Sequence, residues 1–176
     1  IAADMAPGMN RSFLAEEWKH LVPRKHWYQA MDEAAQRVNT EIHTDIQGYD
    51  IDGEIVKAAR ANAAMAGVDK LIHFQQRPVS ELRHSGKYGF VITNPPYGER
   101  LEEKEALPAL YRQIGEAFDR LDTWSKYVIT AYEDAQRYIG KKAAKNRKIY
   151  NGMMKTYFYM FPGPKPPGKH RAEEDA

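Results

Sequence analysis

The sequence predicts an α/β protein with a mainly parallel sheet, helices on both faces of that sheet, and an antiparallel hairpin at its end. Short apolar segments rich in β-branched residues alternate with stretches whose apolar residues recur at three- and four-residue steps. This alternation of strands and helices is typical of a parallel sheet. The last two apolar segments are joined by Asn151-Gly152, which is a strong signal for a hairpin turn.

The elements of the first half follow from local signals in chain order. They are two helices, a strand, a helix and a strand, expected at residues 12–20, 24–39, 42–51, 53–65 and 71–75. Ser12 is placed to cap the first helix, and Pro23 precedes the start of the second. Gly67 follows the third helix where a left-handed glycine often ends one.

The second half is expected to form a strand, a helix, a strand, a short helix and two hairpin strands. Their expected residues are 90–93, 108–121, 124–132, 134–139, 148–150 and 154–161. Pro108 fits a first helical turn, where its missing N–H costs nothing. Residues 102–106 are expected to be a charged loop and residues 141–148 a basic loop. Residues 1–161 would form one domain, and the Pro-, Gly- and charge-rich residues 162–176 a disordered tail.

Composition narrows the classes of function. The chain has 176 residues and a net charge of +2, which permits a nucleic-acid partner, and its basic residues are clustered. Because it has no cysteine, disulfides and thiolate metal sites are excluded, and a reducing cytoplasm is allowed. Its six histidines show no metal-ligand spacing, so no metal is expected. No apolar run approaches the length of a membrane span.

The most informative pattern is the strand at residues 90–93, which runs directly into Asn94-Pro95-Pro96-Tyr97. The run is apolar enough to be buried on both faces, and the prolines make the following turn rigid and extended. The Asn94 amide oxygen and the Pro95 carbonyl are two acceptors that suit the exocyclic amine of a base, on which Tyr97 can stack. Holding both amine hydrogens directs the nitrogen lone pair towards an electrophile. The pattern predicts a base-modifying site, with a rigid strand-end turn as the alternative.

A second polar strand end lies at Tyr49-Asp50-Ile51-Asp52. A carboxylate at this place can accept hydrogen bonds from both ribose hydroxyls, whereas an acid directly before a helix can cap it. We assign Asp50 to the ribose and Asp52 to the cap of the helix at residues 53–65. Because ligands bind beyond the carboxyl ends of parallel strands, Asp50 and Asn94 are expected on the same rim of the sheet. The sequence thus predicts a nucleoside cofactor beside a base pocket.

These segments resemble a known family. The chain is similar to the catalytic domain of the bacterial large-subunit rRNA guanine-N2 methyltransferases that carry a THUMP domain upstream, proteins often described as N6-adenine-specific DNA methylases. The matching segments are residues 6–13 (APGMNRSF), 48–52 (GYDID), 94–100 (NPPYGER) and 150–157 (YNGMMKTY). The seven-residue segment 94–100 is the specific one, because the shorter Asn-Pro-Pro-Tyr also occurs in adenine-N6 and glutamine methyltransferases.

The resemblance implies S-adenosylmethionine as methyl donor, ribosomal RNA as partner, and a Rossmann-like class I methyltransferase sheet. By analogy, Ile51 would pack on the cofactor adenine while Asn94 and Pro95 receive a guanine amino group. The expected catalytic residues are Asn94, Pro95, Pro96 and Tyr97, and the expected cofactor-binding residues are Asp50, Ile51, Asp52, Gln76, Arg77 and Asn94.

The chain departs from the family pattern at two places. The segment Asp-Pro-Phe-Cys-Gly-Ser-Gly-Thr, which forms the first strand and the Gly-rich cofactor loop, would lie before Ile1, so we expect an incomplete cofactor site here. The family has an acid after the third strand of its sheet, which corresponds to residues 71–75 here. Pro78 replaces that acid, and Gln76 or Arg77 could substitute for it. Two other functions stay open: an adenine-N6 methyltransferase acting on DNA or RNA, and a non-catalytic nucleic-acid-binding module.

Overall fold

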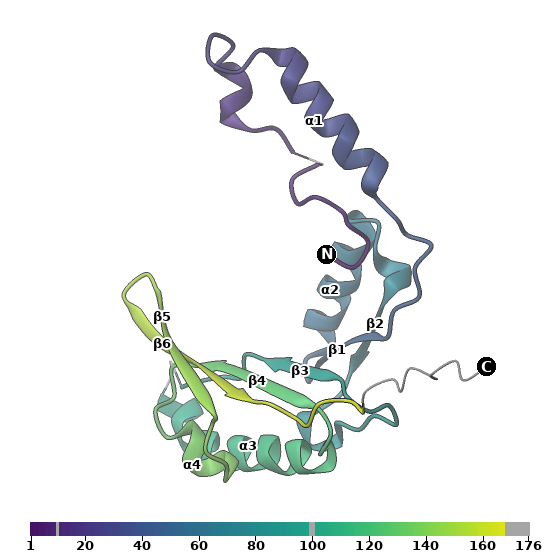
Figure 1. Ribbon diagram of the computed structural model, residues 1–176. Coiled ribbons are helices and arrows are strands. Elements are labelled where there is room, and N and C mark those ends of the chain that lie inside the picture. The colour runs from purple at the N-terminus through teal and green to yellow at the C-terminus, as the bar shows by residue number, and fades with distance from the viewer. Residues whose placement is uncertain (10, 99–100, 168–176) are drawn as a thin grey trace, which may run out of the picture. The chain divides into compact units, whose positions relative to one another are not determined.

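The structure, a computed structural model, describes residues 1–9, 11–98 and 101–167 (Figure 1). The chain divides into two compact units, Ile1–Arg77 and Pro78–Ala176. Each unit holds its own sheet: two strands in the order β1-β2, and four in the order β3-β4-β6-β5. Among the described residues, no helix combines the length and the apolar character that a membrane span requires.

The first unit is built on a parallel β-α-β arrangement preceded by a helical segment. Its elements are η1 (Leu14–Glu17), α1 (Arg24–Arg37), β1 (Ile46–Asp50), α2 (Gly53–Met65), η2 (Asp69–Leu71) and β2 (Ile72–Gln76). Strands β1 and β2 are parallel, with Ile46 opposite Ile72 and Asp50 opposite Gln76. Val56 and Ala63 are the buried residues of α2. Parallel pairing brings the carboxyl ends of both strands to one edge of the sheet.

The predicted helix at residues 12–20 is wrong, since only the short 3-10 turn η1 forms there. The Glu16 carboxylate accepts a hydrogen bond of 2.8 Å from the Phe13 N–H, which closes this turn on itself. Trp18 then leaves the helical conformation, with φ −83° and ψ 56°. The Phe13 ring meets Trp27 of α1 edge-on at 5.6 Å, so Trp27 acts as a packing residue.

The second unit contains the mixed sheet. Its elements are η3 (Val79–Glu81), β3 (Phe90–Thr93), α3 (Leu101–Arg120), β4 (Ser125–Thr130), α4 (Ala135–Ile139), β5 (Lys145–Asn151) and β6 (Met154–Phe161). Strands β3 and β4 are parallel, and β6 runs antiparallel to both β4 and β5. The predicted hairpin is confirmed, and Gly152 at its turn has the positive φ of 59° that such a turn requires.

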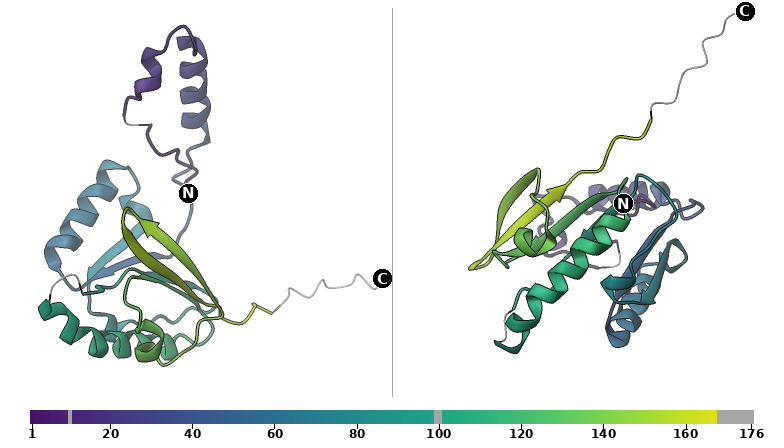
Figure 2. Two further views of the ribbon diagram at one scale, coloured as in Figure 1. Left: turned by 90° about the vertical axis from the view of Figure 1, so that its left-hand side faces the viewer. Right: turned by 90° about the horizontal axis from the view of Figure 1, so that it is seen from below.

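Helices α3 and α4 cover one face of this sheet (Figures 1 and 2). The core beneath them consists of Leu107, Tyr111, Ile114, Phe118, Val128, Ala135, Ile139, Tyr159 and Phe161. The α3 members of this core follow one another at steps of four, three and four, so they form a single stripe along the helix. The buried residues of β4, which are Lys126, Val128 and Thr130, alternate along the strand, as expected for one covered sheet face.

Two predicted boundaries are wrong. Helix α3 begins at Leu101 rather than Pro108, and it includes residues 102–106, which were expected to form a loop. Leu107 is only 3% exposed, and its burial stabilises the early turns although Pro108 removes one helical hydrogen bond. Strand β5 begins within the predicted basic loop, because Lys145 pairs with Met160 of β6.

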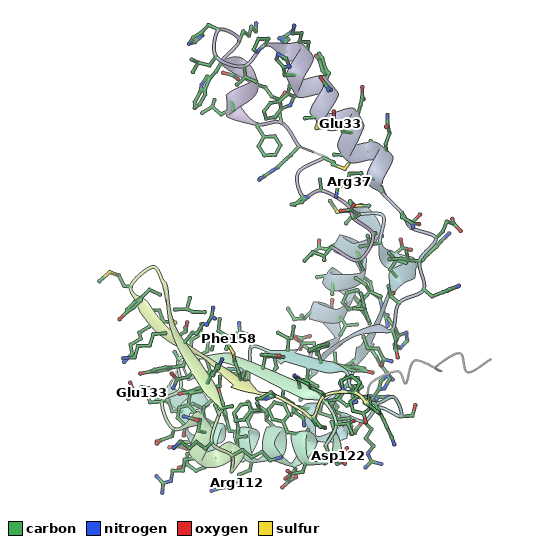
Figure 3. The ribbon with its side chains drawn as sticks, viewed as in Figure 1. Glu33, Arg37, Arg112, Asp122, Glu133 and Phe158 are labelled. Atoms are coloured by element: carbon green, nitrogen blue, oxygen red, sulfur yellow. The ribbon has the colours of Figure 1, made fainter. Side chains whose placement is uncertain are left out.

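Strand β3 is not buried on both faces as predicted. Phe90 and Ile92 are 67% and 75% exposed, since α3 and α4 both pack on the opposite face of the sheet. On the uncovered face the ring of Tyr127 stacks between Phe90, at 6.3 Å, and Phe158, at 5.7 Å. Phe158 is labelled in Figure 3. Residues 162–167 form no helix or strand, and residues 168–176 of the predicted tail lie outside the described residues.

Candidate functional site

The segment after β3, residues 94–98, which we call the platform, presents two hydrogen-bond acceptors that no other described residue uses. Pro95 and Gly98 are buried, Tyr97 is half-buried, and Asn94 is exposed. No described residue forms a hydrogen bond with the side-chain amide of Asn94 or with the carbonyl of Pro95. A planar amine with two hydrogens could therefore meet both acceptors without displacing a contact among these residues.

A buried tyrosine hydroxyl fixes this segment to the core. Tyr111 of α3 donates a hydrogen bond of 3.1 Å to the Pro96 carbonyl. Its oxygen lies 2.5 Å from the Thr130 hydroxyl of β4, and because the Tyr111 proton is used on Pro96, Thr130 is the donor. Thr130 in turn accepts from the backbone N–H of Tyr132 at 3.0 Å. Tyr111 and Thr130 are fully buried, so the network joins the exposed Pro96 of the platform to buried groups of α3 and β4.

Tyr111 was not among the residues predicted from the sequence. Its position between Leu107 and Ile114 on the inward stripe of α3 was the available signal, because a buried tyrosine hydroxyl needs a partner. Burial raises the pKa of Tyr111 to about 12, although the hydrogen bond with Thr130 acts in the opposite direction. The hydroxyl therefore keeps its proton at neutral pH and can donate it to Pro96.

The platform closes against α3 at Gly98. This residue has φ +82°, and a Cβ added to it would lie 2.8 Å from the Lys104 side chain and 3.0 Å from that of Leu107. Only glycine combines this backbone conformation with so close an approach to a helix. The next two residues of the family-specific segment, Glu99 and Arg100, lie outside the described residues.

At the acidic end of β1, the role predicted for one of the two carboxylates is confirmed. Asp52 Oδ1 accepts the Glu54 N–H at 2.8 Å and is the N-cap of α2, which confirms the predicted cap. Asp50 Oδ1 accepts the Asp52 N–H at 2.8 Å. The second oxygen of Asp50 has no hydrogen bond with a described residue, so it is available to a ligand hydroxyl.

Gln76 and Arg77 at the end of β2 are tied to the end of β1. The Gln76 side-chain amide donates to the Ile51 carbonyl at 2.9 Å, and the Arg77 N–H donates to the Asp50 carbonyl at 2.8 Å. The Arg77 guanidinium lies over the Tyr49 ring at 5.1 Å. Ile51 remains 71% exposed, so a carboxylate and an uncovered apolar side chain lie next to each other in sequence at this edge.

The structure thus gathers the expected cofactor residues of the first unit at one edge of its sheet. The expected catalytic residues of the second unit lie on the segment after β3, which Pro96 ties to Tyr111. The roles assigned to these residues stay predictions, as does the shared rim of Asp50 and Asn94. No group of histidine and acidic side chains among the described residues could hold a metal ion.

The fold is that of a class I methyltransferase domain. The solved structure of "a possible methylase from Clostridium difficile 630" matches with a TM-score of 0.88 and 46% identity, covering 94% of this chain and 44% of that one. SMU.472 in complex with SAH matches with a TM-score of 0.87 and 37% identity, again over 94% of this chain and 44% of that one.

The chain belongs to the UPF0020 family, described as the RMKL-like methyltransferase domain, whose model matches residues 1–159. YpsC of Bacillus subtilis (strain 168) is 39% identical over 161 residues, 92% of this chain and 42% of YpsC. The ribosomal RNA large subunit methyltransferase K/L of Shewanella woodyi is 37% identical over 92% of this chain and 23% of its own length. The chain therefore spans less than half of either relative.

We expect Tyr111→Phe to lower the free energy of unfolding by about 1–3 kcal/mol, because Pro96 and Thr130 each lose a buried partner. Chemical denaturation of the variant and the unmodified protein would measure the difference. Tyr28→Phe is the matched control, since Tyr28 is 61% exposed and its loss of a hydroxyl should change stability little. Equal stabilities of the two variants would contradict the role given to the Tyr111 hydroxyl.

The same hydroxyl predicts a loss of stability at alkaline pH. The pKa of Tyr111 is raised to about 12 by burial, while a tyrosine of the unfolded chain titrates near pH 10. The native state keeps a proton that the unfolded state loses, so this contribution is complete below about pH 10 and disappears towards pH 12. Denaturation curves over this range should show a smaller fall for Tyr111→Phe. If the stability of Tyr111→Phe falls as much as that of the unmodified protein, the effect belongs to other groups. Tyr132 and Tyr159 are among them, because burial also raises their pKa values.

Proposed function

We propose that this domain is part of an S-adenosylmethionine-dependent RNA methyltransferase that methylates the exocyclic N2 amine of a guanine in large-subunit ribosomal RNA. The observation that carries the proposal is the platform after β3: two acceptors, at Asn94 and Pro95, that no other described residue uses, on a segment fixed by the buried Tyr111 hydroxyl. The family and the name of the K/L relative support RNA methylation, and the SAH complex of SMU.472 supports the cofactor.

In this proposal the platform orients the base. The Asn94 amide oxygen and the Pro95 carbonyl accept the two hydrogens of the guanine amine, and half-buried Tyr97 stacks on the extruded base. Both hydrogens are then held in the plane of the acceptors, which leaves the nitrogen lone pair pointing out of the ring plane. Pro96 contributes through its backbone, because its carbonyl receives the Tyr111 hydrogen bond. Positioning supplies most of the catalysis, and the proton of the methylated amine passes to solvent.

The strand end of the first unit fits the cofactor chemically. S-adenosylmethionine, when bound, supplies an electrophilic methyl group. The free Asp50 oxygen suits a ribose hydroxyl, and exposed Ile51 suits one face of an adenine ring. Asp52 and Gln76 act indirectly, by capping α2 and by holding the Ile51 carbonyl. We assign Arg77 to the rim of the same site, where its guanidinium lies over Tyr49.

The longer relatives suggest how the domain is used. We propose that the whole protein supplies the Gly-rich cofactor loop from outside this chain, carries a THUMP domain upstream and works on ribosomal RNA in the cytoplasm. The chain covers 42% of YpsC and 23% of the K/L relative, so each has ample additional length for such parts.

Asn94→Ala in the intact protein should abolish RNA methylation while S-adenosylmethionine still binds, because the contact to the amine is lost and Asp50 and Ile51 still hold the cofactor. Mass spectrometry of the RNA nucleosides measures the product, and calorimetry measures the cofactor. Asn62→Ala, an exposed asparagine of α2, serves as control. Normal turnover of the Asn94 variant would refute the platform. N6-methyladenosine in place of N2-methylguanosine would identify the adenine alternative.

Asp50→Asn should weaken S-adenosylmethionine binding by about 10- to 150-fold, the range expected when a hydrogen bond to a charged group is lost. Isothermal titration of the intact protein would measure the dissociation constant. Glu41→Gln removes one exposed negative charge from the same unit and should leave that constant unchanged. Unchanged binding by the Asp50 variant would remove this residue from the cofactor site, and failure of the intact protein itself to bind would favour a non-catalytic binding module.

A further inference from the structure

We propose that the β5–β6 hairpin binds the single-stranded RNA next to the target base, with Lys145, Arg147 and Lys148 on phosphates and Tyr150 on a base. This inference rests on the proposed RNA substrate and adds a second contact surface away from the platform. The hairpin runs out from the sheet, away from α3 and α4 (Figure 1).

The charge of this region has one sign. No acidic residue occurs between Asp134 and Glu173, whereas β5 and the residues before it contain Lys141, Lys142, Lys145, Arg147 and Lys148. Lys141 forms an ion pair with Asp119, and Lys155 of β6 lies 3.8 Å from Glu133. The other four cations form no ion pair with a described residue, and all four are exposed. Their charge is therefore available to an anionic partner.

Strand pairing fixes these cations at regular intervals. Because Lys145 and Arg147 belong to β5, they share one face of the hairpin and lie roughly 7 Å apart, two strand residues. This interval is close to that between successive phosphates of an extended nucleic-acid strand. Lys148 projects from the opposite face, so the cations flank the edge strand rather than form a single patch. The outer edge of β5 has no strand partner among the described residues.

Aromatic and basic side chains alternate on one face of the hairpin. Tyr150 lies opposite Lys155, and Lys148 opposite Tyr157. The Lys155 ammonium lies 4.9 Å from the centre of the Tyr157 ring, which stacks on Tyr159 at 5.6 Å. Tyr159 is 3% exposed and part of the core, so the row is anchored at its inner end. Tyr150 at the outer end is 68% exposed, and an exposed ring in such a row is a stacking surface for a base.

The arrangement of basic and aromatic side chains on the hairpin favours RNA over a lipid surface as its partner. Membrane-surface segments segregate their basic and apolar side chains onto opposite faces. Here Lys148 and Tyr150 share one face of β5, as cation and ring do in single-strand nucleic-acid sites. Met153 at the turn is fully exposed and adds an apolar side chain at the outer end of the hairpin.

The test uses the intact protein with Lys145→Gln, Arg147→Gln and Lys148→Gln combined, and Tyr150→Ala as a separate variant. The matched control combines Lys70→Gln, Lys87→Gln and Lys165→Gln, which removes the same charge from exposed positions outside the hairpin. Binding to a guanine-containing single-stranded RNA oligonucleotide is measured at several salt concentrations, and S-adenosylmethionine affinity and circular dichroism report on the fold.

We expect the triple variant to reduce the slope of log K against log salt by about 2, since each phosphate contact on a single strand contributes about 0.7. Tyr150→Ala should weaken RNA binding by about tenfold or more, as the loss of one stacked base does. Cofactor affinity should stay unchanged in both. RNA affinity and salt slope equal to those of the control triple would overturn the inference. Binding to phosphatidylserine vesicles is measured as well, and hairpin variants that lose vesicle binding but keep normal RNA binding would also overturn it.

Failure of this inference can be told apart from failure of the proposed function. If the intact protein methylates guanine and the hairpin variants bind RNA normally, the inference alone is wrong. If the protein methylates no RNA but the hairpin variants still lose RNA affinity, the proposed reaction is wrong and the hairpin remains a nucleic-acid surface.

Discussion

The hydrogen bond from the Tyr111 hydroxyl to the Pro96 carbonyl is the contact on which the second unit's site depends. The two prolines make the segment stiff, but stiffness alone does not set its direction relative to the sheet. That direction is set by a donor on α3 whose own oxygen is held by Thr130 of β4. Since both side chains are fully buried, the Tyr111–Thr130 bond is shielded from water, and the platform takes its position from the core.

The two strand ends use their hydrogen-bonding groups differently. At the end of β1, most polar groups satisfy one another: Asp52 caps α2, Asp50 receives the Asp52 N–H, and Gln76 holds the Ile51 carbonyl. At the end of β3, the groups predicted to meet the base have no hydrogen bond with a described residue, while the neighbouring Pro96 carbonyl is bonded. Bonding every group except those needed by a ligand keeps a site ordered before the ligand arrives, which lowers the cost of binding.

The sequence predicted correctly those features that are determined by residues close together in the chain. The strand at residues 90–93, the helix at 53–65, the Asp52 cap and the Asn151-Gly152 turn are all present as predicted. Errors arose where tertiary packing decides: α3 extends back to Leu101 because Leu107 is buried, and β5 includes Lys145 because β6 pairs with it. Tyr111 was missed for the same reason, since its partners Pro96 and Thr130 are 15 and 19 residues away.

The shared anchoring of platform and core has a consequence for reading mutational screens of this family. Leu107 supports α3 and also lies against the place where Gly98 ends the platform, so a change in its volume reaches both. A misplacement of the amine nitrogen by about 1 Å can lower the rate by about 100-fold without unfolding the chain. Some conservative replacements inside this hydrophobic core should therefore score as inactive yet abundant protein, and residues that never touch RNA or cofactor would then be mistaken for active-site residues.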